Sequence, residues 1–171
     1  MVHFLNYVDE AIKKNWDKPA VSNYGAKTYT YGEMAASIEK MHLLFEKCGI
    51  KKGDKIALCA KNSAEWCISF LAIVSYDAVA VPLLPDFLPS NVADLTRLSG
   101  SRMLMLDNNI YDALSREGVL PQFGSLRISM ALWMSFLWML WPVHQRSLYG
   151  CAPMQRVHSR ESSRAVWLQS M

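Results

Sequence analysis

The sequence predicts an α/β domain in which a layered parallel sheet carries helices on both faces. Three short apolar runs, at residues 55–60, 78–84 and 102–106, are typical of strands buried on both sides. Stretches with helical periodicity separate these runs, and parallel strands need crossover connections that are usually helices. With 51% hydrophobic and 19% charged residues, the composition is that of a globular protein.

The first elements are a short helix and a hairpin. Apolar residues from Phe4 to Trp16 recur at helical spacing, which predicts an amphipathic helix. Segments 20–23 and 27–30 then flank Gly25, and a glycine between two short extended segments favours a β-hairpin.

A capping box introduces the next helix. Thr30 and Glu33 are spaced so that each side chain can satisfy a free backbone N–H of the first turn. An apolar stripe along residues 34–48 follows, and Gly49 stands where a helix commonly ends in left-handed geometry. This segment gives the best-defined helix in the sequence.

The remaining elements alternate regularly. They are a strand at 55–60, a helix at 66–74 behind a cap at 62–65, a strand at 78–84, a helix at 91–98 closed by Gly100, a strand at 102–106 and a helix at 108–116. The helix at 66–74 is apolar nearly all round, so we expect it to be mostly buried.

Charge divides the chain into two parts. Residues 1–118 hold 13 Lys and Arg against 14 Asp and Glu, whereas residues 119–171 hold five Arg and the single acid Glu161. We therefore expect a partial domain over 1–118 and a separate tail over 119–171. The scattered arginines of the tail do not form the dense basic face that nucleic acid requires, so no nucleic-acid partner is expected.

The tail is predicted to be non-native or poorly ordered, and out-of-frame translation would explain its composition. Lysine is absent, tryptophan and methionine are frequent, and element boundaries are missing. The apolar run 128–141 would reach roughly 21 Å as a helix, which is short of the ~30 Å hydrocarbon core of a membrane. Membrane contact by the tail is therefore not the expectation.

The cysteines and histidines give no metal or catalytic signal. Cys48, Cys59, Cys67 and Cys151 form no CxxC pair, and no histidine has a ligand partner at metal-binding spacing. We interpret the cysteines as reduced core thiols and expect a cytoplasmic protein. The N-terminal residues do not resemble a signal peptide.

Four consecutive blocks carry a family resemblance. They are TYTYGEM at 28–34, GIKKGDKIAL at 49–58, NSAEW at 62–66 and DAVAVPL at 77–83. In this order and spacing they resemble the N-terminal subdomain of the adenylate-forming superfamily, the acyl-CoA synthetases and their relatives. The resemblance covers about residues 20–115, and its most similar subgroup is the bacterial long-chain fatty acid CoA ligases.

The resemblance implies a two-step reaction. A fatty acid carboxylate would attack the α-phosphate of ATP to give an acyl-adenylate, and the thiol of coenzyme A would then displace AMP, with Mg²⁺ at the triphosphate. Such enzymes use a loop similar to SSGTTGxPK, which this sequence lacks. No catalytic, cofactor-binding or metal-binding residue of the family can be carried over, because the matched blocks read as caps, turns and strand ends.

Two hypotheses follow. The first is an N-terminal fragment of an ATP-dependent acyl-CoA synthetase, inactive alone because the phosphate-binding loop and the C-terminal lid domain are missing. The second is an accessory binding or membrane-associated protein that keeps the subdomain and uses the apolar tail as an anchor. One departure from the family pattern is Asp77, which stands where the family usually has glycine. Aspartate tolerates left-handed geometry, so we expect the turn to persist.

Overall fold

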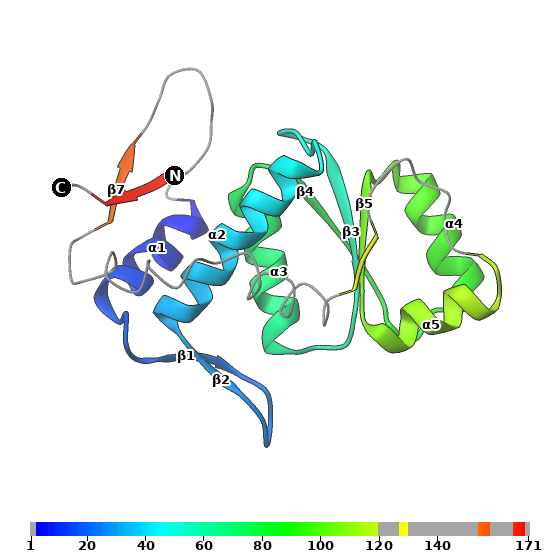
Figure 1. The fold of residues 1–171 in the computed structure, drawn as a ribbon, viewed down its shortest axis with the longest axis horizontal. Coiled ribbons are helices and arrows are strands. Elements are labelled where there is room, and N and C mark those ends of the chain that lie inside the picture. Colours follow the sequence, from blue (N-terminus) through cyan, green and yellow to red (C-terminus); the bar gives the residue numbers. More distant parts are fainter. Residues whose placement is uncertain (1–2, 120–126, 130–153, 158–165, 170–171) are drawn as a thin grey trace.

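The computed structural model describes residues 3–119 and three short strands beyond them. The elements in chain order are α1 (Phe4–Lys14), β1 (Pro19–Ser22), β2 (Thr28–Thr30), α2 (Tyr31–Lys47), β3 (Lys55–Cys59), α3 (Ala64–Ser75), β4 (Val79–Leu83), α4 (Pro89–Ser99), β5 (Met103–Leu106), α5 (Asn108–Arg116), β6 (Arg127–Ser129), β7 (Met154–Val157) and β8 (Val166–Gln169). Figure 1 shows their arrangement.

A parallel sheet in the order β4-β3-β5-β6 forms the centre of the molecule. Ile56 of β3 stands in register with Ala80 of β4 on one side and with Met103 of β5 on the other. β6 pairs with β5 at the far edge, Leu104 opposite Arg127. This fourth strand was not predicted, and it lies in the segment that the sequence separates from the domain.

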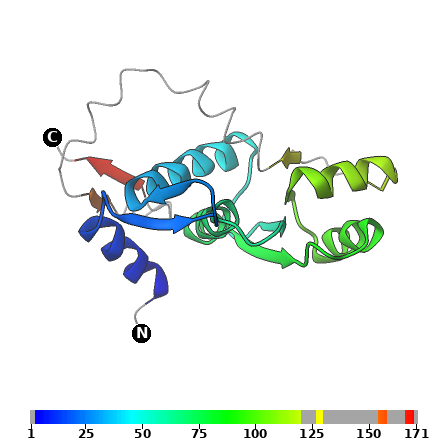
Figure 2. The ribbon, with the colours of Figure 1, turned by 90° about the horizontal axis from the view of Figure 1, so that it is seen from below.

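Helices cover both faces of the sheet, which confirms the predicted fold class. In β3 and β5, alternate side chains point to opposite faces. Ile56, Leu58, Met103 and Met105 join the core beneath α2 and α3, and Ala57, Cys59, Leu104 and Leu106 join a second core with α4 and α5. Figures 1 and 2 show α3 and the α4–α5 pair on either side of the central strands.

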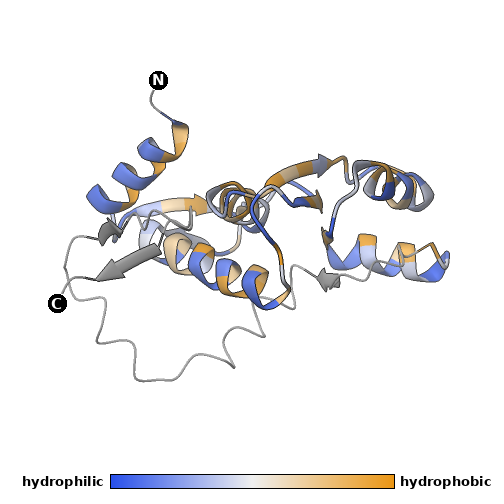
Figure 3. Cartoon of the chain, turned by 90° about the horizontal axis from the view of Figure 1, so that it is seen from above, coloured by the Kyte–Doolittle hydropathy of each residue, from blue (hydrophilic) through white to orange (hydrophobic). Residues whose placement is uncertain are grey.

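The N-terminal elements largely follow the sequence pattern. α1 ends at Lys14, so Trp16, which the helical spacing includes, lies beyond the helix. Its indole ring instead lies against Gly32, where an added Cβ would approach Trp16 Cε2 to 2.6 Å. In Figure 3, α1 and α2 alternate between hydrophilic and hydrophobic colours, as expected for helices with one buried face.

Local capping signals are confirmed. The Thr30 hydroxyl accepts from the Glu33 N–H at 3.2 Å, and the Glu33 carboxylate accepts from the Thr30 N–H at 2.9 Å. Gly49 closes α2 with φ of 69°. Ser63, within the predicted cap segment, is the N-cap of α3 and accepts from the Trp66 N–H at 3.1 Å.

The tail is described only in part. β7 and β8 pair as an antiparallel hairpin, while most of the apolar run 128–141 and Cys151 lie outside the described residues. The prediction for the tail therefore stays a prediction. Within the described residues, no helix combines the length and the apolar character that a membrane crossing requires.

Candidate functional site

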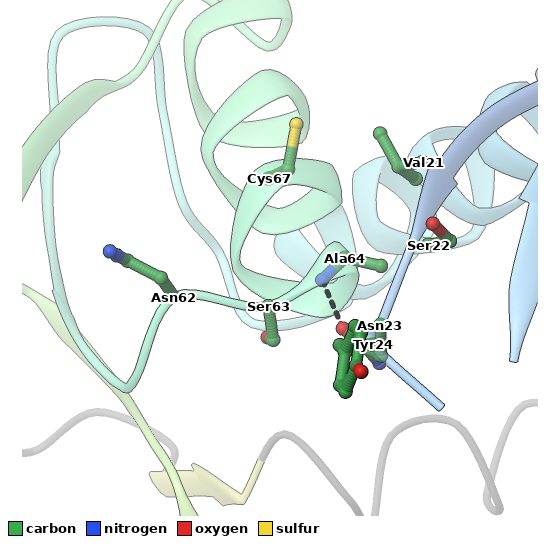
Figure 4. Close-up of a pocket in the computed structure, with 8 residues that line it drawn as sticks. All are labelled: Val21, Ser22, Asn23, Tyr24, Asn62, Ser63, Ala64 and Cys67. Carbon is green, nitrogen blue, oxygen red and sulfur yellow. Dashed lines mark hydrogen bonds between the residues drawn. The ribbon is translucent and has the colours of Figure 1, made fainter. Parts of the chain in front are cut away.

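An open pocket of about 320 Å³ lies where the hairpin meets the start of α3. β1 and the turn after it form one wall, and the loop after β3 with the first turns of α3 forms the other (Figure 4). The lining residues are Val21, Ser22, Asn23, Tyr24, Asn62, Ser63, Ala64 and Cys67. Most of their polar groups are amides and hydroxyls, and none of these residues is an acid or a base.

Asn23 ties the two walls of this pocket together. Its amide oxygen accepts from the Ala64 N–H at 2.7 Å, the bond drawn in Figure 4. Its amide nitrogen donates to the Glu65 carboxylate at 2.8 Å, and the Tyr29 hydroxyl donates to the other Glu65 oxygen at 2.8 Å. The hairpin is thereby fastened to the N-terminus of α3, where free N–H groups favour a negative charge.

Glu65 is held ionised by these contacts. Burial acts to raise its pKa, but hydrogen bonds from Asn23, from its own backbone N–H, from Tyr29 and from Ser63 together lower the pKa. Tyr29 shifts in the opposite sense, because burial and then the hydrogen bond to the Glu65 carboxylate raise its pKa. Both carboxylate oxygens of Glu65 accept a hydrogen bond, so Asn23, Tyr29 and Glu65 hold the hairpin on α3 rather than act as an acid–base pair. We refer to these three residues as the Glu65 clamp.

Burial raises the pKa of each cysteine thiol in the described residues. Cys59 is fully buried, and burial with the nearby Asp107 charge raises its pKa to about 11. Burial also raises the pKa of Cys48 and of Cys67, which are both half-buried. Because the thiolate is the nucleophilic form, these shifts disfavour nucleophilic reactivity, most strongly at the fully buried Cys59. The interpretation as core thiols is confirmed for Cys59 and holds in part for the other two.

The carboxyl ends of the strands are where parallel α/β sheets usually bind ligands. Here the Asp107 carboxylate accepts from the Lys61 N–H at 2.7 Å, and the Asp107 N–H donates to the Cys59 carbonyl at 3.3 Å. These bonds tie the ends of β3 and β5 together. Asp107 precedes α5 but makes no side-chain capping bond there, because its carboxylate is engaged with Lys61.

The residues singled out in the matched blocks have structural roles. Trp66 stacks on Phe70 with ring centroids 5.5 Å apart, and Asp54 joins the starts of β3 and β5 by accepting from Arg102 at 3.1 Å. Asn62 lines the pocket but is not the helix cap. The long-range bonds of Glu65 were not foreseen, since no local sequence pattern encodes a partner 42 residues away.

No group of three or more His, Cys, Asp or Glu side chains within the described part of the chain could hold a metal ion. The site is thus a polar pocket beside the hydrogen bonds that join the hairpin to α3.

The fold and its sequence blocks define a family. The chain matches the AMP-binding enzyme family over residues 8–145. Because this match spans most of the chain, the protein belongs to the AMP-binding family, whose members are adenylate-forming enzymes. The match extends past residue 118, where the sequence predicts the domain to end.

Curated relatives include surfactin synthase subunits and CoA ligases. Surfactin synthase subunit 2 of Bacillus subtilis (strain 168) is 28% identical over 102 residues, which is 60% of this chain and 3% of that protein. 4-Coumarate–CoA ligase 3 of Arabidopsis thaliana is 28% identical over 113 residues, or 66% of this chain and 20% of that protein. The chain thus spans a fifth or less of the length of these relatives.

Solved structures share the fold. The Klebsiella oxytoca NpsA N-terminal subdomain in complex with 3-hydroxybenzoyl-AMSN has a TM-score of 0.61 at 21% identity, covering 76% of this chain and 31% of that one. A benzoate CoA ligase from Burkholderia xenovorans LB400 has a TM-score of 0.68 at 15% identity, covering 79% and 28%. At these identities the likeness concerns the fold alone.

Proposed function

We propose that this chain is the N-terminal part of an enzyme that activates a carboxylic acid with ATP, and that it supplies scaffold rather than chemistry. The observation that carries the proposal is the family match over residues 8–145. Every matched block in the described residues has a capping, turn or packing role. A chain with this scaffold and no phosphate-binding loop is expected to be inactive alone.

The acid itself is a proposal at the level of class. Residues 79–106 resemble long-chain fatty acid CoA ligases, whereas the curated relatives named above are a surfactin synthase subunit and a 4-coumarate–CoA ligase. These observations support a carboxylic acid that is activated by adenylation, with ATP, Mg²⁺ and coenzyme A or a carrier thiol as the partners of the complete enzyme. Palmitate represents the fatty acids, and 4-coumarate represents the aromatic acid that the coumarate ligase relative is named for.

A chimaeric enzyme tests the scaffold role. Residues 8–119 of this chain would replace the structurally equivalent segment of Arabidopsis 4-coumarate–CoA ligase 3, to which this chain is similar over 113 residues. We expect ATP–pyrophosphate exchange dependent on 4-coumarate, because the grafted elements restore the same sheet and helices. The control chimaera carries Ile68→Asp, which buries a charge in the core and should abolish exchange. A soluble, folded chimaera without exchange would contradict the proposal.

A further inference from the structure

α5 ends in a motif that is completed by residues beyond the helix. Gly118 has φ of +66°, and its N–H donates to the Ser115 carbonyl at 3.2 Å. The Val119 N–H donates to the Leu114 carbonyl at 3.1 Å. A left-handed glycine with this pair of bonds is the Schellman motif, which an apolar contact commonly accompanies. That contact is present, because Val119 packs against the core that contains Leu114. Val119 thus has a folded environment, although the sequence places it at the start of the tail.

A strand follows α5 in the same parallel sheet. β6 pairs with β5, Leu104 opposite Arg127 and Met105 opposite Ile128, and Figure 1 shows it as the yellow arrow beside β5. α5 packs on the core of this side of the sheet through Leu114. β5, α5 and β6 therefore form a strand–helix–strand unit of the kind that parallel strands require.

The four strands of the sheet end at the same level. Cys59 of β3 stands opposite Leu83 of β4 and opposite Leu106 of β5, and each of these residues is the last of its strand. Leu106 in turn stands opposite Ser129, the last residue of β6. A peptide of unrelated origin has no reason to share both the direction and the end point of the sheet. The register thus indicates that the chain between α5 and β6 belongs to the fold.

β5 has the sequence of an inner strand. Its residues, Met103–Leu106, are all buried, and they include neither a charge nor a proline. Edge strands usually carry such residues, because these prevent pairing with other chains. β4, at the opposite edge, does contain Pro82. We therefore expect β5 to have a partner on its outer side, where β6 lies.

The family match covers the same residues, since it runs from 8 to 145. We propose that residues 119–129 are part of the folded domain, as the end of the β5–α5–β6 unit, and that any loss of reading frame lies after Ser129. The scaffold then comprises four parallel strands instead of the three expected from the sequence. This inference concerns the extent of the domain and does not depend on catalytic activity.

Amide hydrogen exchange of the full 171-residue chain tests the place of β6. N–H groups within residues 127–129 that bond to β5 should exchange at least roughly tenfold more slowly than in the denatured chain, because they open only with the sheet. Peptide mass spectrometry resolves this segment from the rest of the tail. Exchange at the denatured rate throughout 127–129 overturns the inference.

Two proline variants test whether the protection comes from β5. Arg127→Pro and Ile128→Pro each remove one N–H, and neighbouring N–H groups of a strand point in opposite directions. One variant should therefore lose a bond to β5 and exchange roughly tenfold faster in 127–129, while the other changes far less. Ser163→Pro, beyond β6, is the control and should leave this segment unchanged. If neither proline in β6 alters the exchange, the pairing with β5 is contradicted.

Val119 provides an independent measurement by urea titration. Val119→Asp should raise the equilibrium constant of unfolding by roughly fivefold or more, because it places a charge against an apolar core. Val119→Ile keeps the apolar contact and is the matched control. An aspartate variant that does not fold supports the contact, whereas equal stability of the two variants counts against it. Protection of β6 without pyrophosphate exchange in the chimaera supports this inference while counting against the proposed function.

Discussion

Asp77 holds a backbone conformation that most side chains avoid. Its φ is +63°, and it is the one non-glycine residue with positive φ within the described residues. Its carbonyl accepts from the Gly53 N–H at 2.8 Å, and its carboxylate accepts from Lys52 at 3.1 Å. The expectation that aspartate would keep the turn of the family's glycine is therefore confirmed.

Replacing Asp77 separates backbone geometry from charge. Asp77→Ala should lower the free energy of unfolding by about 1 kcal/mol, because alanine lacks the local tolerance of left-handed geometry that aspartate has. Asp77→Asn keeps that tolerance and loses only an exposed ion pair, which is worth roughly 0–1 kcal/mol. Urea titration of the two variants measures the difference, and an asparagine variant as unstable as the alanine one would assign the effect to charge.

His42 and Glu39 are one turn apart on α2, and their pKa values are shifted in opposite directions. The Nε2 atom of His42 lies 3.1 Å from the Ala72 carbonyl and 2.9 Å from the Ser75 hydroxyl. The Ser75 hydroxyl itself donates to the Leu71 carbonyl at 2.6 Å, so Nε2 must carry a proton in the neutral ring. Burial lowers the pKa of His42 to about 4, and burial raises the pKa of Glu39 to about 7.

The signs of these shifts give a pH prediction. The lowered pKa of His42 gives stability that is present above pH ~6.5 and is lost as pH falls toward about 4. The raised pKa of Glu39 gives stability that is present below pH ~4.5 and is lost as pH rises through about 7. Between pH ~4.5 and pH ~6.5, the His42 contribution makes stability rise with pH and the Glu39 contribution makes it fall.

Unfolding free energies measured from pH 4.5 to 8 should resolve the two groups. His42→Gln should make stability fall less steeply on acidification, since the buried imidazole no longer has to be charged. Glu39→Gln should make stability fall less steeply at rising pH. Variants with the same pH dependence as the parent chain would show that neither buried group controls it.

At the level of elements, the Glu65 carboxylate provides two of the hydrogen bonds that attach the hairpin to α3. Glu65 accepts from Asn23 and from Tyr29, which lie in or beside the hairpin, and it stands in the first turn of α3. A contact that joins segments so distant in sequence should couple their stability.

A double-mutant cycle measures this coupling. Tyr29→Phe and Glu65→Met should each cost about 1–2 kcal/mol of unfolding free energy, because the first leaves one Glu65 oxygen, and the second leaves the Tyr29 hydroxyl, without its hydrogen-bond partner. The double variant should be less destabilised than the sum of the two, since both changes remove the same hydrogen bond. Additive costs would indicate that the Tyr29–Glu65 bond contributes nothing.

The predictable elements are those encoded by neighbouring residues. The capping box at Thr30 and the glycine end of α2 depend on contacts within a few positions, and the apolar run of β3 is continuous in the chain, so the sequence predicts all three. The end of α1 before Trp16 was missed because the apolar spacing continues while the ring packs against Gly32. The Glu65 clamp was missed because it forms only when distant segments meet.

For the whole molecule, the tail distinguishes the two hypotheses: an enzyme fragment produced by a loss of reading frame, and an accessory protein with a genuine tail. The sequence predicts a loss of reading frame between about Ser115 and Gln122, whereas the family match continues to residue 145. The DNA sequence of the gene shows whether the tail arises from a loss of reading frame. Another frame from about codon 115 should encode a loop similar to SSGTTGxPK; if neither alternative frame does, the tail is genuine and the accessory-protein hypothesis gains weight.

We propose that this chain is scaffold from a carboxylate-activating enzyme, and we expect that it does not itself perform the chemistry. In residues 3–119 the matched blocks supply a capping box at Thr30, the N-cap of α3 at Ser63 and the stacked Trp66. The most direct test is ATP–pyrophosphate exchange by the purified 171-residue chain, with palmitate and with 4-coumarate. We predict exchange at the level of the enzyme-free control with either acid. Exchange above that level, dependent on acid and on Mg²⁺, would contradict the account.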